Sequence, residues 1–285
     1  MKKKTLIPLA LVIALSLMLL TGCGGDKAGT ETGTGAGTGE TKLIPIVVGA
    51  TPVPHVEILT FIKEKMAEEG YDLQIREFTD YVQPNMATES GELDANFFQH
   101  VPYMEDFNEK NNTHMVSVFP VHFEPLGLYK ARVKSIEDLP DGAIIAVPND
   151  GTNRARALQL LEATGLLKLE EGVGLSATKL DIVDNPKNFD IKEIEAAQIP
   201  LVLPDVDMAV INGNYALGAN LSIITDAVAS EEKDSLSATT YANPIVVKAG
   251  NEENEGILAL IKVLNTSEVR DFILDKYEGF VVPVF

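Results

Sequence analysis

The stretch AIIAVPNDGTNRARALQLL, residues 143–161, reads as a buried strand that runs through a tight polar turn into a helix. Its first five residues are apolar and partly β-branched, which is typical of a buried strand. Pro148 ends the strand, and the Asn-Asp-Gly sequence at 149–151 supplies turn chemistry. Thr152 or Asn153 can then cap a helix that carries leucines into a core. The stretch therefore predicts a strand–turn–helix unit of an α/β protein.

The same unit is a candidate ligand site. A strand that enters a helix through a tight turn points backbone N–H groups, and the positive end of the helix, at whatever lies above the turn. Arg156 is expected in the first turn of this helix, where its guanidinium could hold a carboxylate through two hydrogen bonds. This segment alone does not decide between such a site and a plain strand–turn–helix with solvated arginines.

Strands and helices alternate on both sides of this unit, from about residue 43 to residue 285. Such alternation indicates helices packed on largely parallel sheets, and roughly 240 residues are enough for two modest domains or one large one. Strands are expected at 44–50, 72–78, 93–96, 143–147, 180–183, 207–211 and 245–248. Helices are expected at 56–69, 84–91, 102–110, 191–198, 253–264 and 267–277.

The N-terminus has the form of a bacterial lipoprotein signal. Lysines at 2–4 precede an apolar run at 6–20, and Leu-Thr-Gly-Cys follows at 20–23. A run of about 15 residues is short for a hydrocarbon core of roughly 30 Å, which favours a cleaved signal over a membrane span. Cys23, the single cysteine of the chain, falls at the cleavage position of a lipobox. We expect its thiol to carry palmitate-type acyl chains; the alternative is a simple signal with an incidental cysteine.

The next segment and the overall charge narrow the possible partners. Residues 24–42 consist almost entirely of Gly, Thr, Ala, Glu, Asp and Lys, which predicts a flexible tether. The formal net charge is −19 at pH 7, and loss of the signal lysines makes the remainder more acidic. An acidic surface argues against binding to nucleic acid and against lying flat on an anionic leaflet.

Polar and aromatic residues gather at the expected ends of strands, where open α/β sheets bind their ligands. Tyr81 and the run NFFQHVPY at 96–103 could line a pocket for an apolar, polarisable side chain such as a thioether. Asn212 follows a buried strand, and Asn243, in the run YANP at 241–244, is a further candidate for a ligand contact. Asparagine offers both donors and acceptors. Ordinary core aromatics and turn-forming asparagines remain the alternative interpretation.

Enzymatic and metal-binding interpretations find little support. The chain contains no Gly-x-Ser-x-Gly elbow, His-Glu-x-x-His helix, P-loop or Gly-x-Gly-x-x-Gly motif. Its histidines, His55, His100, His114 and His122, lack the short spacing of catalytic zinc motifs and could form a metal site only by meeting in space. We therefore predict no catalytic activity, no metal and no cofactor.

Several long motifs occur in a fixed order: FQHVPY at 98–103, HFEPLGLY at 122–129, VPNDGTN at 147–153, AVINGNYA at 209–216 and YEGFVVP at 277–283. With the C-terminal segment 269–285, they resemble the NlpA/MetQ family, the methionine-binding lipoproteins of ABC importers. The resemblance covers essentially the whole chain after the tether and agrees with the lipobox.

The resemblance implies an α/β fold of the periplasmic-binding-protein type, with two α/β lobes joined by two crossover strands and a ligand cleft between them. We place the crossings near 127–130 and 240–244. The expected organisation is a signal peptide at 1–22, a lipidated cysteine and tether at 23–42, one lobe at 43–127 plus 243–285, and a second lobe at 128–242.

The family pattern also implies roles for site residues. Tyr81, Phe98, His100 and Tyr103 would surround the thioether, Arg156 would pair with the substrate carboxylate, and Asn149, Asn212 and Asn243 would hold the α-amino and carboxylate groups. The chain departs from the pattern at Leu201, where many relatives have arginine, and at Pro204. These departures leave open whether that region contacts the permease or only packs.

The resulting hypothesis is a lipid-anchored, non-enzymatic solute receptor on the extracytoplasmic face of the cell membrane. It would capture L-methionine between two closing lobes and deliver it to an ABC permease with its ATPase subunit. One alternative is a surface interaction or adhesion lipoprotein on the same fold. Another is a receptor for a different amino acid or for a methionine-containing dipeptide.

Overall fold

The computed structural model describes residues 42–232 and 236–285. The expected signal peptide, Cys23 and all of the tether except Lys42 lie outside these residues. Among the helices that are described, none has the length and apolar character needed to cross a membrane.

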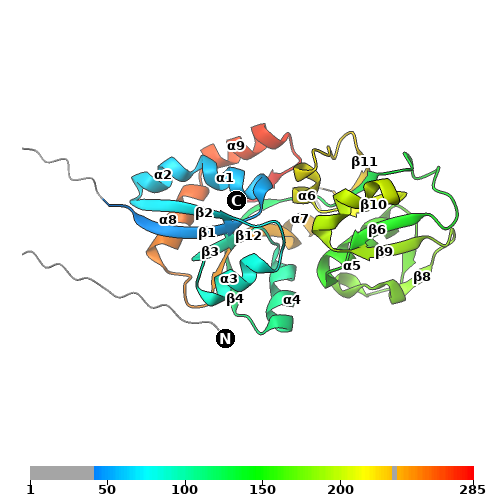
Figure 1. The fold of residues 1–285 in the computed structure, drawn as a ribbon, viewed down its shortest axis with the longest axis horizontal. Helices are drawn as coiled ribbons and strands as arrows, with labels where there is room; N and C mark the ends of the chain where they lie inside the picture. Colours follow the sequence, from blue (N-terminus) through cyan, green and yellow to red (C-terminus); the bar gives the residue numbers. More distant parts are fainter. Residues whose placement is uncertain (1–41, 233–235) are drawn as a thin grey trace, which may run out of the picture. The chain divides into compact units, whose positions relative to one another are not determined.

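A six-stranded mixed sheet in the order β13-β4-β12-β3-β1-β2 forms the centre of what we call lobe 1 (Figure 1). β1 is parallel to β2 and β3, whereas β12 is antiparallel to β3 and β4. The strands are β1 (Ile44–Ala50), β2 (Tyr71–Glu77), β3 (Ala95–Phe97), β4 (Met115–Phe123), β12 (Ala242–Lys248) and β13 (Val282–Pro283). The helices are η1 (Pro52–Val56), α1 (Glu57–Phe61), α2 (Lys63–Glu68), α3 (Gln83–Ser90), α4 (Val101–Asn111), α8 (Glu255–Leu264) and α9 (Ser267–Tyr277).

A five-stranded sheet in the order β11-β5-β10-β6-β9 forms the centre of lobe 2. β6 is parallel to β9 and β10, and β5 is antiparallel to β10 and β11. The strands are β5 (Gly127–Lys130), β6 (Ile144–Pro148), β9 (Asp190–Ile194), β10 (Met208–Ile211) and β11 (Ala227–Ser230), with a two-stranded sheet of β7 (Lys168–Leu169) and β8 (Ile182–Asp184). The helices are α5 (Gly151–Ala163), α6 (Gly213–Gly218), α7 (Leu236–Thr240) and the 3₁₀ segments η2 (Gly174–Ser176), η3 (Lys179–Asp181) and η4 (Ala196–Asp205).

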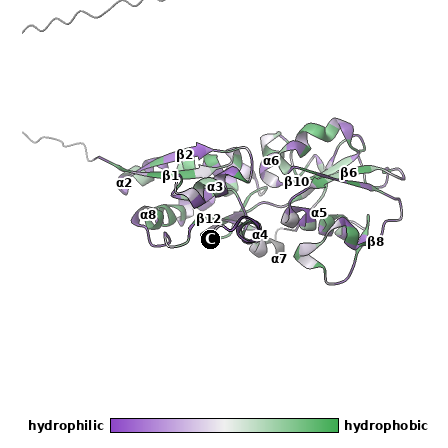
Figure 2. Ribbon diagram, turned by 60° about the horizontal axis from the view of Figure 1, so that its bottom comes forward, coloured by the Kyte–Doolittle hydropathy of each residue, from purple (hydrophilic) through white to green (hydrophobic). Residues whose placement is uncertain are grey.

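The position of a strand in its sheet determines how polar it is. β6 lies between β9 and β10 and is mostly green in the hydropathy view of Figure 2, whereas the edge strand β2 is largely purple. An interior strand of a sheet covered by helices buries both faces, so its residues are nearly all apolar. The helix α5 closes one face of the lobe 2 sheet with fully buried residues such as Leu158 and Leu161.

The chain passes between the two sheets twice. After β4 ends at Phe123 it enters β5 at Gly127, and after α7 it returns to lobe 1 through β12, which begins at Ala242. The links therefore lie at or beside the crossings that we expected near 127–130 and 240–244. The lobe boundaries given above stay a prediction.

Four local expectations were wrong. Asp150, not Thr152 or Asn153, caps α5, because its side chain accepts from the backbone N–H of Asn153 at 2.9 Å. The helix begins one residue after this cap, so Arg156 lies in its second turn. The expected helix at 191–198 is instead strand β9 followed by 3₁₀ turns, and β9 pairs in register with β6. In addition, the expected helix at 56–69 is divided into η1, α1 and α2.

Candidate ligand-binding site

A small cavity lies where segments that follow several strands converge. It is lined by Tyr81, Phe98, Gln99, His100, Tyr103, Glu124, Asn153, Arg156, Asn212, Gly213, Asn214 and Asn243. Seven of the eight site residues expected from the sequence are in this list.

The eighth, Asn149, lies elsewhere. It follows β6, is exposed to solvent and does not line the cavity. Asn153, one turn into α5, reaches the cavity in its place. The reason is the cap at Asp150, which starts the helix early enough to turn Asn153 toward the site.

Aromatic rings form one wall of the cavity. The ring of Tyr81 lies 5.6 Å from that of Phe98 and meets Tyr103 edge-on at 5.7 Å. The hydroxyl of Tyr103 donates to the backbone carbonyl of Tyr81 at 3.2 Å, which fixes the two rings relative to each other. Such a wall presents polarisable ring faces and edges, the surroundings that favour a thioether.

Asn153 orients the polar side of the cavity. Its Oδ1 accepts from Nε2 of His100 at 3.1 Å and from Nδ2 of Asn212 at 2.8 Å, and its own Nδ2 donates to Asp150. Burial is the main cause that lowers the pKa of His100 to about 3, with the charge of Arg156 as the next cause. His100 is therefore neutral at pH 7, and Nδ1 accepts from the backbone N–H of Tyr103.

The guanidinium of Arg156 is already held by the protein. Its Nε and one terminal nitrogen, Nη2, donate to the two carboxylate oxygens of Glu231 at 2.7 and 2.5 Å. Nη2 also donates to the backbone carbonyl of Glu124 at 2.8 Å, and the ring of Tyr241 lies 4.3 Å from the guanidinium carbon. These bonds use Nε and Nη2, and no described residue accepts from Nη1, so its two N–H groups can donate to a ligand.

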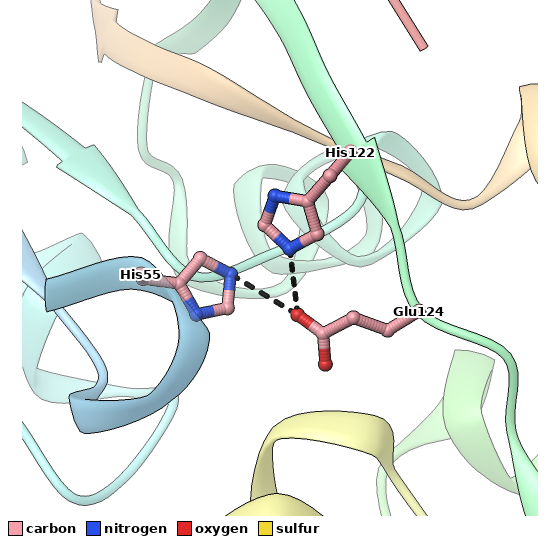
Figure 3. A group of neighbouring side chains, drawn as sticks. All are labelled: His55, His122 and Glu124. Carbon is pink, nitrogen blue, oxygen red and sulfur yellow. Dashed lines mark hydrogen bonds and ion pairs between the residues drawn. The ribbon is translucent and has the colours of Figure 1, made fainter. Parts of the chain in front are cut away.

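A buried His–Glu–His cluster adjoins the cavity (Figure 3). Nε2 of His122 lies 2.8 Å from Oε1 of Glu124, and Nε2 of His55 lies 3.4 Å from the same oxygen. Burial lowers the pKa of both histidines to about 3, so each is neutral at pH 7. His122 can donate its Nε2 proton to the carboxylate, whereas Nε2 of His55 has its hydrogen-bond partner in Oδ1 of Asn243 at 3.4 Å. Burial also raises the pKa of Glu124, whereas the charge of Arg156 and a hydrogen bond from the backbone N–H of Asn214 act in the opposite direction.

The same three residues have the ligand types of a zinc site, so we tested their fit. A histidine that binds zinc through Nε2 carries its proton on Nδ1 and almost always donates it to a partner. His122 Nδ1 is buried and has no such partner among the residues that the structure describes. The separation of 2.8 Å between His122 and Glu124 is that of an ordinary hydrogen bond. A hydrogen-bonded cluster with neutral histidines fits this geometry better than a metal.

Besides the bond between His100 and Asn153, two hydrogen bonds join the lobes beside the cavity. The hydroxyl of Tyr81 donates to Oδ1 of Asn214 at 2.5 Å, and the hydroxyl of Tyr215 donates to the backbone carbonyl of Thr79 at 3.1 Å. Both bonds connect the loop after β2 in lobe 1 with α6 in lobe 2. The structure therefore has the two lobes in direct contact at the site.

Sequence reasoning assigned no ligand contact to Glu124, Asn153 or Asn214, and it included Gln99 only as part of the run 96–103, although all four line the cavity. Glu124, Asn153 and Asn214 lie inside motifs that carried the family resemblance, so the signal was present. Gln99 is tied to the lobe 1 core, where its side-chain amide donates to Asn85 Oδ1 at 2.6 Å and to Asn96 Oδ1 at 2.8 Å.

Comparison with known proteins identifies the family to which the chain belongs. Residues 46–285 match the model of the NlpA lipoprotein family. The methionine-binding lipoprotein MetQ of Bacillus subtilis is 38% identical over 288 residues, which cover 100% of this chain and 99% of that protein. The membrane lipoprotein TpN32 of Treponema pallidum is 44% identical, covering 81% of this chain and 85% of the relative.

A solved structure agrees in fold. A nutrient binding protein from Burkholderia cenocepacia, bound to methionine, superimposes with a TM-score of 0.79 and is 43% identical. The match covers 84% of this chain and 100% of that one. With two sheets and two crossings, the chain thus has the two-lobe α/β fold of the periplasmic-binding-protein type.

Proposed function

The chain belongs to the NlpA lipoprotein family, and from this premise we propose that it is a substrate-binding receptor that captures methionine between its two lobes. The observation that carries the proposal is a single cavity with an aromatic wall on one side and hydrogen-bonding groups on the other. This division matches an amino acid whose side chain is apolar and whose backbone end is charged.

We assign the ligand contacts from this division. The thioether lies against Tyr81, Phe98 and Tyr103, where ring edges provide sulfur contacts of about 0.3–1.5 kcal/mol each. The Nη1 N–H groups of Arg156 donate to the ligand carboxylate, while Nε and Nη2 keep their hydrogen bonds to Glu231. Asn212 and Asn243 complete the polar end, with His100 at the junction of the two sides.

The wider role is transport. The receptor is anchored to the membrane through acylated Cys23, stands on the extracytoplasmic face and delivers methionine to an ABC permease with its ATPase subunit. The family match to lipoproteins supports the anchor, and the MetQ relative supports the ligand. We propose a non-enzymatic role, because the relatives are named as binding lipoproteins.

Calorimetry on protein stripped of ligand by unfolding and refolding tests the function. We expect L-methionine to bind with a dissociation constant of about 1 μM or tighter, equivalent to roughly −8 kcal/mol. L-leucine and glycyl-methionine serve as comparison ligands for the two alternative substrate classes. Heat with either of these and none with methionine would reassign the substrate. A protein that bound none of them would lose the receptor role and leave the adhesion alternative.

A further inference from the structure

Glu231 does not line the cavity, but it binds the arginine that does. We propose that Glu231 is a positioning residue, which holds the guanidinium of Arg156 in place before the ligand arrives and leaves the Nη1 N–H groups for the ligand carboxylate. This inference rests on the proposed function, because it specifies how the chain prepares the charged end of its site for an amino acid.

Both carboxylate oxygens of Glu231 are engaged and fixed in direction. Oε1 accepts from Nε of Arg156 at 2.7 Å, and Oε2 accepts from Nη2 of the same side chain at 2.5 Å. Oε2 also accepts from the backbone N–H of Leu126 at 2.8 Å, and the backbone N–H of Glu231 donates to the carbonyl of Leu126 at 3.0 Å. A guanidinium bound through two parallel hydrogen bonds is held in one plane. Glu231 therefore sets the plane of the Arg156 guanidinium.

Other neighbours of Arg156 restrict the guanidinium further. The rings of Tyr241 and Phe123 lie 4.3 and 5.6 Å from its central carbon, and the backbone carbonyl of Glu124 accepts from Nη2 at 2.8 Å. The arginine side chain is only 4% exposed. A ligand carboxylate thus meets a side chain that is already ordered, so binding avoids most of the entropy cost of immobilising it.

The contact between Glu231 and Arg156 does not require the lobes to be closed. Arg156 lies on α5 and Glu231 directly follows β11, and both elements belong to lobe 2. Leu126, which fixes Glu231, lies in the link between β4 and β5. The guanidinium should therefore keep its orientation when the lobes part.

A carboxylate beside an arginine can also act by its charge alone, and the two roles predict different results. A charge interaction changes little when a side chain is shortened by one methylene group, whereas a pair of hydrogen bonds depends steeply on distance and angle. Glu231→Asp separates the roles, because aspartate keeps the charge but is one methylene group shorter.

The test measures the binding of L-methionine and of 3-(methylthio)propylamine, which keeps the thioether and the ammonium group but lacks the carboxylate. Wild-type protein should prefer methionine by a factor of about 30 or more, the usual effect of losing one partner of a buried charge pair. Immobilising a long side chain on binding costs a factor of about 3–10 in affinity. In calorimetric titrations, Glu231→Asp should therefore bind methionine about 3–10 times more weakly, and the amine within about twofold of wild type.

Asp207→Glu is the matched control. Asp207 accepts from Nε of Arg132 at 3.1 Å and from the backbone N–H of Ile144 at 2.7 Å, so it has the same kinds of partner, but it lies outside the cavity. This variant also displaces a carboxylate by one methylene group and should leave both affinities unchanged.

Three results would overturn the inference. The first is wild-type methionine affinity in Glu231→Asp, which would leave Glu231 with a charge effect only. The second is an equal loss for both compounds, which would show a general disturbance of the lobe. The third is a selective loss of methionine affinity in Asp207→Glu as large as that in Glu231→Asp.

If Glu231→Asp does not fold, NMR of the ligand-free wild-type protein decides. The Nε–H signal of Arg156, identified by its absence from Arg156→Lys, should exchange slowly with water because Nε donates to Glu231. Exchange as fast as that of Arg76, whose side chain is 48% exposed, would overturn the inference.

Failure of the proposed function gives a different result. A wild-type protein that bound leucine but not methionine would refute the proposed substrate. Leucine and 3-methylbutylamine would then replace the test pair, and a selective loss of leucine affinity in Glu231→Asp would still support the positioning role. A wild-type protein that bound neither amino acid would refute both the function and the inference.

Discussion

Arg156 shows how one side chain can serve both the ligand and the framework of the site. It binds Glu231 with two hydrogen bonds and the backbone carbonyl of Glu124 with a third. Glu231 in turn accepts the backbone N–H of Leu126 at 2.8 Å. The arginine therefore ties the first crossing segment to the chain that leads to the second, so its loss affects more than a ligand contact.

Arg156→Ala should weaken methionine binding by roughly two to three decades, because removing one partner of a desolvated charge pair costs about 2–5 kcal/mol. It should also lower the free energy of unfolding, since Glu231 is left buried without its cation. Phe98→Ala should lose less affinity and accept other apolar amino acids more readily. Arg156→Lys should recover only part of the loss, because an ammonium lacks the planar fork.

Side-by-side calorimetric titration of these three variants, with circular dichroism as the check on folding, measures the prediction. Near-wild-type affinity in a folded Arg156→Ala protein would place the ligand carboxylate elsewhere in the cavity.

Three buried histidines predict how stability depends on pH. The pKa values of His55, His100 and His122 are lowered by burial to about 3, below the ordinary value of 6.5 that they regain on unfolding. Between these values the unfolded chain binds more protons, so the free energy of unfolding should fall as pH falls from about 6.5 toward 3. Each histidine contributes a slope of up to about 1.4 kcal/mol per pH unit.

The raised pKa values of Glu124 and Asp150 act in the opposite direction over their own ranges, but these are two groups against three. Denaturant unfolding at pH 7, 6 and 5 provides the measurement. A free energy of unfolding that stayed constant or rose over this series would mean that the histidines are protonated in the folded protein.

At the scale of elements, α6 depends on a close approach that only glycine permits. Its first residue, Gly213, packs against Glu124 so tightly that an added Cβ would lie 2.7 Å from the Cβ of Glu124. Gly213→Ala should displace the glutamate and α6 together and weaken methionine binding about tenfold or more. Gly218→Ala, in the same helix, is the matched control because no atom lies within 4 Å of the added Cβ.

Calorimetric titration and thermal unfolding of both variants check this. Equal affinity in the two alanine variants would show that the contact between α6 and Glu124 does not shape the ligand site.

The elements also show what the sequence could and could not predict. The unit at 143–161 was recognisable because its apolar run, turn residues and leucines follow local rules, and β6 and α5 lie where these rules placed them. β9 was mistaken for a helix because its two isoleucines, Ile191 and Ile194, stand three residues apart. Only pairing with β6, a contact distant in sequence, makes this segment a strand.

The site residues also divide into those that could be predicted from the sequence and those that could not. Residues that stand out by type, such as Tyr81, His100 and Arg156, could be selected from the sequence, and they line the cavity. The orienting role of Asn153 could not be predicted from the sequence, because it depends on the position of the helix start, which the cap at Asp150 sets. Glu124 was missed because its surroundings come from His55, far away along the chain.

At the scale of the whole molecule, the anchor and the ligand site should be separable. Cys23→Ala should release the protein into the soluble fraction, because the acyl chains are what hold it to the membrane. Methionine affinity should not change, since the flexible tether isolates the cavity from the anchor. Fractionation of cells and titration of the released protein measure the two halves of the prediction. A variant that stayed wholly with the membrane would contradict the lipid anchor.

The hydrogen bonds from Tyr81 to Asn214 and from Tyr215 to Thr79 have a consequence for timing. We expect a ligand in the cavity to leave only when these bonds and the one between His100 and Asn153 break and the lobes part, so its residence time should follow the opening rate of the protein. The same motion should limit how fast a new ligand enters.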